Sequence, residues 1–128
     1  MLELYHHGTS VCAAKPRIVL GEKGLQWTSH YIDILTGEQF APAYLKLNPK
    51  GEVPTLVHDG FVLHQSTLIG EYLDEVFPDP PLKPDNARDR YRMRLWGKRI
   101  DEEVEIFGQR LASPEAKAAF MAFLARKR

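Results

Sequence analysis

A short proline-rich segment divides this sequence into two parts with unlike hydrophobic patterns. Residues 77–84 read Phe-Pro-Asp-Pro-Pro-Leu-Lys-Pro, with four prolines in eight positions. Neither a helix interior nor a central strand accepts so many prolines, because proline lacks a backbone N–H and has a fixed φ. We therefore predict a first domain at residues 1–77, a linker at 78–84 and a second, all-helical domain that begins at 85 and runs to 128.

The first part has the pattern of a mixed α/β domain. Four short strands are predicted, at residues 2–6, 27–34, 55–58 and 61–64. A helix beginning at Ser10 joins the first two strands, which are therefore expected to be parallel. Asp59-Gly60 is a strong signal for a tight turn between the last two, and a helix capped by Ser66 follows them. A weak helical face spans 40–47. We expect a four-stranded mixed sheet with helices packed on it.

The second part shows one apolar stripe at helical spacing. Its members are Met93, Trp96, Ile100, Val104, Phe107 and Leu111. Such a stripe predicts one long helix. Ser113-Pro114-Glu115 predicts the start of another helix that runs to the end of the chain. Six basic residues and one acidic residue fall between Arg88 and Arg99, which indicates a solvated face or a contribution to a dimer interface.

Composition narrows the class of protein. Hydrophobic residues make up 44% of the chain and charged residues 27%, which is typical of a globular domain. Lys plus Arg and Asp plus Glu number 17 each, so the basic surplus of a nucleic-acid-binding protein is missing. No signal peptide and no apolar run of about 20 residues is present. We expect a cytoplasmic protein that binds neither a nucleic acid nor a membrane.

The turn after the first strand is a candidate reactive site. Thr9-Ser10-Val11-Cys12 lies at a helix start, where unpaired N–H groups and the helix dipole stabilise an anion such as a thiolate. Ser10 is either a plain N-cap or a hydroxyl donor to that anion. Cys12 competes with it, because a thiol at a helix start ionises readily and can form a mixed disulfide. With one cysteine and no Cys-x-x-Cys, a dithiol cycle is excluded.

Two further turns bear on binding. Val53-Pro54 precedes a strand. A cis bond there would expose the N–H and C=O of Val53 for pairing with an extended peptide, whereas an ordinary trans proline would only begin a strand. Gln65-Ser66 opens a helix, where free N–H groups suit a carboxylate or Ser66 acts as a simple cap. The five histidines form no set of ligands that predicts a metal site.

Taken together and in order, these motifs resemble those of the soluble glutathione transferases. The most specific stretches are 48–56, Asn-Pro-Lys-Gly-Glu-Val-Pro-Thr-Leu, and 65–73, Gln-Ser-Thr-Leu-Ile-Gly-Glu-Tyr-Leu. The resemblance runs from Leu2 to about Glu102. Gln65-Ser66, and a serine two positions before a cysteine, are most similar to the zeta-type and related bacterial branches. The resemblance implies a thioredoxin-like fold followed by the start of an all-helical domain, shortened here.

The resemblance also implies roles for individual residues. Ser10 would hydrogen-bond the sulfur of glutathione, a co-substrate that attacks a small electrophile. Val53, beside a cis Pro54, would pair with the cysteinyl backbone. Gln65 and Ser66 would hold the γ-glutamyl end, and Gln39 could reach the glycine end. The resemblance also implies a homodimer. The alternatives are a zeta-like isomerase, a Cys12-based thiol transferase, and a non-catalytic module that binds partners or dimerises.

Overall fold

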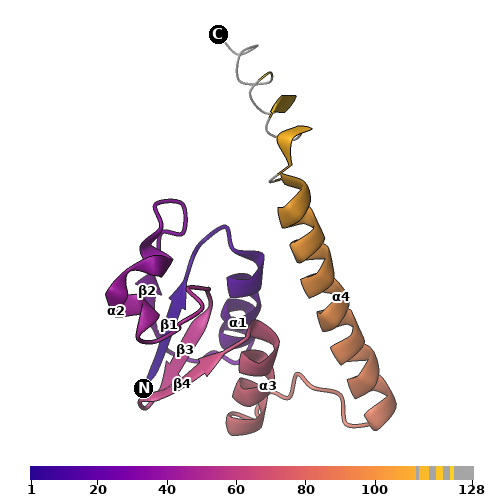
Figure 1. Cartoon of the computed structure of the whole chain (residues 1–128). Coiled ribbons are helices and arrows are strands. Elements are labelled where there is room, and N and C mark those ends of the chain that lie inside the picture. The colour runs from indigo at the N-terminus through magenta and orange to yellow at the C-terminus, as the bar shows by residue number, and fades with distance from the viewer. Residues whose placement is uncertain (112, 116–117, 120–121, 123–128) are drawn as a thin grey trace. The chain divides into compact units, whose positions relative to one another are not determined.

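A computed structural model describes residues 1–111, 113–115, 118–119 and 122 of the chain. It contains two compact units, Met1–Ala87 and Arg88–Arg128. In chain order the elements are β1 (Leu2–His6), α1 (Val11–Glu22), β2 (Thr28–Tyr31), the 3-10 turn η1 (Glu38–Phe40), α2 (Pro42–Leu45), β3 (Thr55–His58), β4 (Phe61–His64), α3 (Ser66–Val76) and α4 (Ala87–Leu111). Figure 1 labels the helices and strands.

The sheet has the predicted mixed topology. Its four strands lie in the order β2-β1-β3-β4. β1 and β2 are parallel, as expected for strands joined by a crossover helix. β3 is antiparallel to both β1 and β4, and β3 and β4 form the hairpin that Asp59-Gly60 predicts. The thioredoxin-like α/β fold expected of the first part is thereby confirmed.

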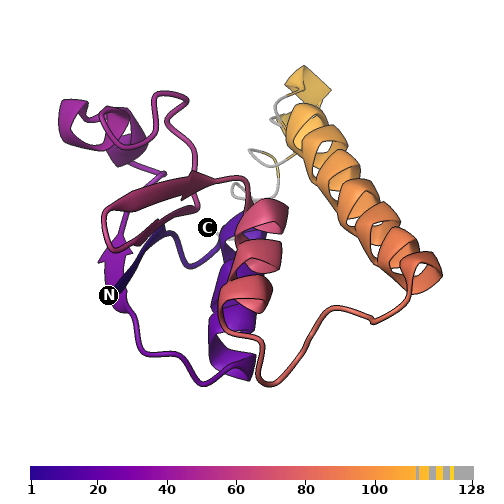
Figure 2. The ribbon, with the colours of Figure 1, turned by 90° about the horizontal axis from the view of Figure 1, so that it is seen from below.

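The core lies between one face of the sheet and two helices. Figures 1 and 2 show α1 and α3 side by side on that face, with α2 on the other side of the sheet. The buried cluster comprises Leu2, Leu4, Leu20, Leu56, Ile69 and Leu73. Alternation along β1 directs Leu2 and Leu4 to the same face. Each fully buried aliphatic side chain stabilises the fold by roughly 1.5–3 kcal/mol.

Three local predictions need correction. β2 is shorter than the predicted 27–34, because the backbone N–H of Asp33 is taken by the Glu38 carboxylate at 2.7 Å and the chain turns. The segment at 40–47 is divided into η1 and α2 rather than one helix, with Pro42 as the first residue of α2. Ser66 is not the cap of α3. Gln65 occupies that position, and Ser66 is the first helical residue.

A buried ion pair holds the proline-rich segment against α1 and α3. Lys23, at the end of α1, has a side chain with no exposed surface, and its ammonium lies 2.7 Å from the carboxylate of Asp74 on α3. The same ammonium donates to the carbonyls of Phe77 and Pro80, each at 2.7 Å. Asp74 accepts the backbone N–H groups of residues 82 and 83 at 2.9 and 3.1 Å. The segment after α3 is therefore anchored by charge-assisted hydrogen bonds.

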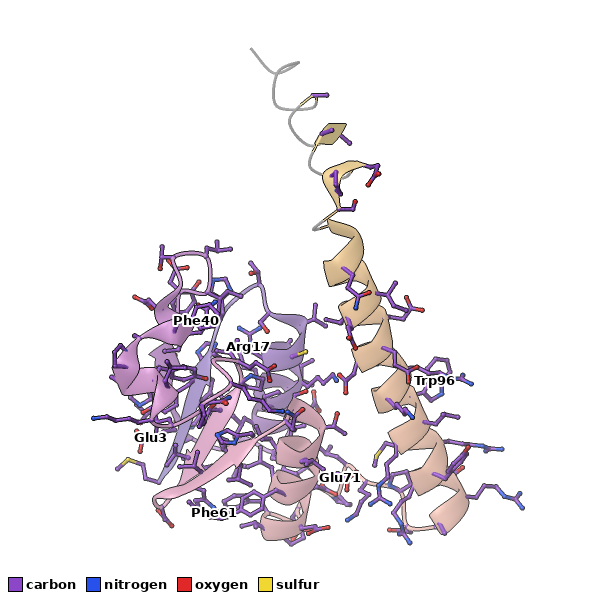
Figure 3. All side chains as sticks on the ribbon, in the orientation of Figure 1. Glu3, Arg17, Phe40, Phe61, Glu71 and Trp96 are labelled. Atoms are coloured by element: carbon purple, nitrogen blue, oxygen red, sulfur yellow. The ribbon has the colours of Figure 1, made fainter. Side chains whose placement is uncertain are left out.

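Helix α4 begins the second unit. Apolar side chains on it that are largely exposed include Tyr91, Trp96, Ile100 and Ile106. The Arg99 guanidinium lies 5.5 Å from the ring centroid of Trp96, a cation–π contact; Figure 3 labels Trp96. The expected helix from Ser113 onward falls mostly on residues outside those described. Among the described residues, no helix is both long enough and apolar enough to cross a membrane.

The ion pair generates a stability prediction. Asp74→Asn leaves the buried ammonium of Lys23 without a counter-charge, so we expect the free energy of unfolding to fall by about 3 kcal/mol or more at neutral pH. Urea denaturation measures it. Glu75→Gln is the matched control, since the exposed Lys83–Glu75 pair at 3.2 Å should contribute under about 1 kcal/mol. Equal effects of the two substitutions would contradict a structural role for the buried pair.

The same pair predicts a pH dependence. Burial raises the pKa of Asp74, but hydrogen bonds from Lys23 and two backbone N–H groups outweigh it, so the pKa lies below its ordinary value. A carboxyl with a lowered folded-state pKa stabilises the fold above its unfolded pKa, about 3.9. That stabilisation is lost as the pH falls through the folded-state pKa. The difference in stability between wild type and Asp74→Asn should therefore shrink below about pH 4.

Candidate functional site

The register of the sheet brings the three predicted turns to one end of it. Tyr5 of β1 pairs with Thr55 of β3, and Thr55 pairs in turn with His64 of β4. This row lies at the carboxyl ends of β1 and β4 and at the amino end of β3. The Ser10 turn follows β1, Val53 precedes β3 and Gln65 follows β4. All three therefore lie at the same end of the sheet, and α1 and α3 begin there on the same face.

Ser10 is the N-cap of α1. Its Oγ accepts the backbone N–H of Ala13 at 3.1 Å, which confirms the capping role. A serine hydroxyl has one proton to donate besides its acceptor lone pairs. Capping uses a lone pair and leaves the proton for a second partner, so the two readings of Ser10 are compatible. Cys12 is the second residue of the helix and is half-buried.

The Val53–Pro54 peptide bond is cis, as predicted. Pro54 is buried and Val53 is half-buried. Within the part of the chain that the structure describes, neither the N–H nor the C=O of Val53 forms a hydrogen bond. A backbone segment with both groups unpaired beside a strand can bind an extended peptide through main-chain hydrogen bonds.

A buried polar network holds the loop that carries Val53. The Tyr44 hydroxyl donates to the carbonyl of Glu52 at 2.6 Å and lies 2.9 Å from the Thr55 hydroxyl. The Asn48 amide donates to the same two oxygens at 2.9 and 3.3 Å. Burial raises the pKa of the Tyr44 hydroxyl, against the hydrogen bonds, so it stays protonated as a donor. Asn48 belongs to a motif that is visible in the sequence, but the network was not predicted, because no local pattern links Tyr44 to Asn48 or Thr55.

Gly51 meets two constraints that only glycine satisfies. Its φ is +63°, in the left-handed region. A Cβ there would lie 2.9 Å from two ring carbons of Phe40 and 3.1 Å from the carbonyl oxygen of Gln39. The loop before Val53 therefore packs closely against η1; Phe40 is labelled in Figure 3.

The junction of β4 and α3 has an unusual backbone. Gln65 adopts φ +71° and ψ +109°, which a residue with a Cβ rarely occupies and which costs about 1–3 kcal/mol. Such outliers concentrate at functional sites. The Gln65 side chain is exposed, and Ser66 is buried. His64 bonds the carbonyl of Leu47 at 2.8 Å, which ties this junction to the loop of the buried network. The sequence contains no signal for this backbone strain.

Gln39 lies in η1, on the segment that leaves β2 at this same end of the sheet. Its amide nitrogen donates to the carbonyl of Ile34 at 3.3 Å. Its amide oxygen is buried and has no hydrogen-bond partner among the described residues. A buried acceptor without a donor is costly. Gln39 therefore carries a buried, unpaired acceptor as a local cost and keeps a second amide hydrogen for a ligand.

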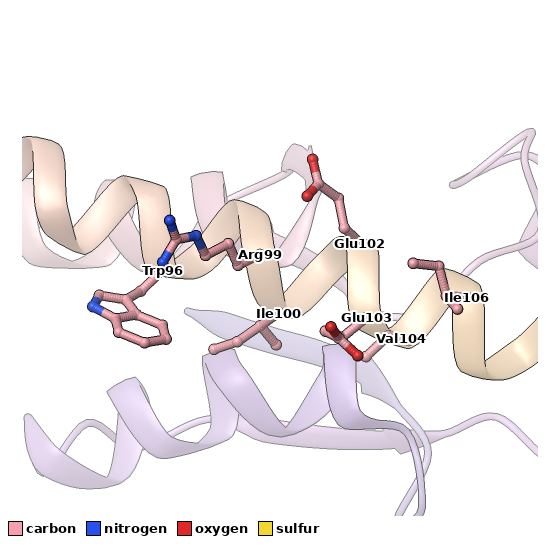
Figure 4. Close-up of a pocket in the computed structure, with 7 residues that line it drawn as sticks. All are labelled: Trp96, Arg99, Ile100, Glu102, Glu103, Val104 and Ile106. Atoms are coloured by element: carbon pink, nitrogen blue, oxygen red, sulfur yellow. The ribbon is translucent and has the colours of Figure 1, made fainter.

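Other parts of the chain do not form a comparable site. In the described ranges, no three His, Cys, Asp or Glu side chains are grouped so that they could hold a metal ion. His30 instead contacts Glu3 at 2.8 Å, and His6 contacts Ser29 at 2.7 Å. A hollow in the surface of α4 is lined by residues of that helix alone, including Trp96 and Glu103 (Figure 4). It contains none of the predicted site residues.

Comparison with known proteins shows the family to which this chain belongs. The family described as "Glutathione S-transferase, N-terminal domain" matches residues 9–76, so the chain belongs to the glutathione S-transferase family. The chain is 42% identical over 103 residues to LigF of Sphingobium sp., covering 79% of this chain and 40% of LigF. The crystal structure of that β-etherase superposes with a TM-score of 0.74.

Two further solved structures are similar. A maleyl pyruvate isomerase, a bacterial zeta-class glutathione S-transferase, is 34% identical with a TM-score of 0.70 and covers 73% of this chain and 44% of its own. A glutathione transferase homologue from Sulfitobacter with bound glutathione is 26% identical with a TM-score of 0.75, over 91% of this chain and 59% of its own. The chain spans 40–59% of the length of these three relatives.

The Gly51 geometry predicts a loss of stability on substitution. Gly51→Ala introduces a Cβ at positive φ and against Gln39 and Phe40, so the free energy of unfolding should fall by about 1–3 kcal/mol. The control is Gly21→Ala in α1, where a Cβ meets nothing within 4 Å and where alanine should be neutral or stabilise by up to about 1 kcal/mol. Urea denaturation of both variants measures the difference. Similar values would show that the loop relaxes around the new methyl group.

Proposed function

We propose that this chain is the glutathione-binding part of a glutathione transferase, which activates the thiolate of glutathione for attack on a small electrophile. The main support is the convergence of two helix N-termini and one unpaired backbone edge at one end of the sheet. Membership of the family, and a relative with bound glutathione, support the identity of the ligand. Glutathione is then a co-substrate, and the proposed mechanism does not use a metal.

The proposed binding mode follows from the groups available. The unpaired N–H and C=O of Val53, beside Pro54, pair with the cysteinyl backbone of glutathione. The N–H groups at the start of α3, with Ser66 and Gln65, hold the γ-glutamyl carboxylate and amine. Gln39 binds the glycine end through its second amide hydrogen.

Activation of the thiol requires a modest free energy. A free thiol has a pKa of about 8.5, and lowering it by about 2 units takes roughly 2.7 kcal/mol of preferential stabilisation of the thiolate. The hydroxyl of Ser10 donates one charge-assisted hydrogen bond to the sulfur while its lone pair caps α1. The positive end of the α1 dipole contributes the rest. The thiolate then attacks the electrophile.

Several properties of the whole protein belong to this proposal. We propose a cytoplasmic homodimer with domains at residues 1–77 and from 85 onward, joined by a linker at 78–84. The electrophile would bind to a pocket that the first unit does not complete. A zeta-like, glutathione-dependent isomerase is a second candidate, supported by the likeness to maleyl pyruvate isomerase. Binding of reduced glutathione, measured by calorimetry, tests both, because both require it.

Two single substitutions test whether Ser10 or Cys12 supports the chemistry. Ser10→Ala removes the hydrogen bond to the thiolate but none of the peptide contacts. We expect thiolate-dependent turnover to fall about 10–100-fold while the Kd for glutathione changes little. Cys12→Ser should retain activity. Steady-state kinetics and calorimetry on the same preparations give both values. Loss of all activity in Cys12→Ser would assign the chemistry to a Cys12 thiol-transferase mechanism instead.

The exposed apolar side chains of α4 generate a prediction about assembly. Trp96 and Tyr91 are 62% and 65% exposed, and large exposed apolar patches mark association sites. We expect the 128-residue chain to be dimeric or larger at micromolar concentration, measured by light scattering. Trp96→Glu should shift it toward the monomer, whereas Phe61→Glu, at a 60% exposed side chain in the β3–β4 hairpin, should not. A monomeric wild-type chain would refute this expectation.

A further inference from the structure

We propose that His7 is a positioning residue, whose ring nitrogen Nδ1 holds Thr9 and thereby sets the turn that presents Ser10. This inference rests on the proposed function, because it concerns the residue assigned to the glutathione sulfur. His7 follows β1 directly and lies three residues before Ser10 in the chain. Its side chain is only 2% exposed, and neither the capping of α1 nor the proposed peptide contacts use it.

The ring of His7 folds back over its own turn. The backbone N–H of Thr9 donates to Nδ1 at 3.2 Å, and the Thr9 hydroxyl lies 2.9 Å from the same atom. The backbone N–H of Ser10 donates to the carbonyl of His7 at 3.2 Å. Arg17 donates to the carbonyl of Gly8 at 3.2 Å from α1; Figure 3 labels this side chain. Each residue of the turn is therefore held by a hydrogen bond before Ser10 caps the helix.

These contacts define the state of the His7 ring. A backbone N–H is a donor only, so Nδ1 must be an acceptor, and the Thr9 hydroxyl donates to it as well. The neutral ring then carries its proton on Nε2. That nitrogen faces the Asp33 carboxylate at 3.9 Å, too far for a hydrogen bond but close enough for the negative charge to favour this tautomer. The ring of Tyr31 packs on His7 at 5.0 Å between centroids.

Asp33 connects the Ser10 turn to the segment that carries Gln39. Its carboxylate accepts the N–H of Leu35 at 3.0 Å, and its carbonyl accepts the N–H of Glu38 at 3.1 Å. Glu38 is the residue before Gln39 and the first of η1. His7 thus lies between two parts of the proposed site, at the sulfur end and at the glycine end. An apolar side chain of similar size could fill this space but could accept no hydrogen bond.

The test replaces the acceptor and then restores it. His7→Leu keeps the volume approximately and removes Nδ1. His7→Asn places an amide oxygen close to the position of Nδ1 and so restores an acceptor. Thr9→Val, at an exposed position, removes only the hydroxyl and serves where His7→Leu does not fold. For each variant, calorimetry gives the Kd for reduced glutathione, and ultraviolet absorbance of the thiolate, followed against pH, gives the pKa of the bound thiol.

We expect the pKa of the bound thiol to rise by about one unit in His7→Leu, the scale of one hydrogen bond to a charged group. It should rise by less in Thr9→Val and return toward wild type in His7→Asn, with Kd within about threefold throughout. The inference is overturned if the pKa of the bound thiol keeps its wild-type value in both His7→Leu and Thr9→Val. It is also overturned if the affinity for glutathione falls by the same factor as the ionised fraction of the thiol. Failure of the wild type to bind glutathione overturns the proposed function, and this inference with it.

Discussion

The pairing of β3 with both β1 and β4 is the constraint on which the rest of the first unit depends. One antiparallel row, Tyr5–Thr55–His64, aligns the end of β1, the start of β3 and the end of β4. A shift of one residue in that register would turn the buried face of β3 outward, and Leu56 would leave the core. The same alignment brings the Ser10, Val53 and Gln65 turns to one end of the sheet. Burial of the core and assembly of the site are therefore set by a single register.

The two faces of the sheet make different contributions. On one face, aliphatic side chains from β1, β3, α1 and α3 form the apolar core. On the other, Tyr44 and Asn48 form a buried polar network with Thr55 and the carbonyl of Glu52. A fully satisfied polar network specifies one loop conformation more strictly than apolar packing does. The network therefore restricts the conformation of the loop that carries Val53.

Charge is used sparingly and mostly away from the proposed site. The buried Lys23–Asp74 pair holds the segment after α3. At the proposed site, by contrast, the anion-binding groups are backbone N–H groups at two helix starts and neutral hydroxyl and amide side chains. Fixed dipoles of this kind stabilise a thiolate without reorganisation when the charge forms. The strained backbone of Gln65 and the unpaired oxygen of Gln39 are local costs that the surrounding packing offsets.

The sequence by itself determined the element order, the mixed topology and the turns that matter. Asp59-Gly60 indicated a hairpin, a crossover helix required parallel strands, and the motif around Val53-Pro54 indicated the cis bond that the structure contains. These signals are local, or are carried by short motifs. Three local features were predicted wrongly: the cap of α3, the length of β2 and the partition of residues 40–47. The Glu38 carboxylate that accepts the Asp33 N–H, and the backbone of Gln65, depend on residues outside the short stretch from which each feature was predicted. Tertiary structure alone decided which buried polar groups meet: Tyr44 with Thr55, and Lys23 with Asp74. Such pairings join residues far apart in the chain, and no periodicity encodes them, since they arise only when the sheet register and the helix packing place their side chains together.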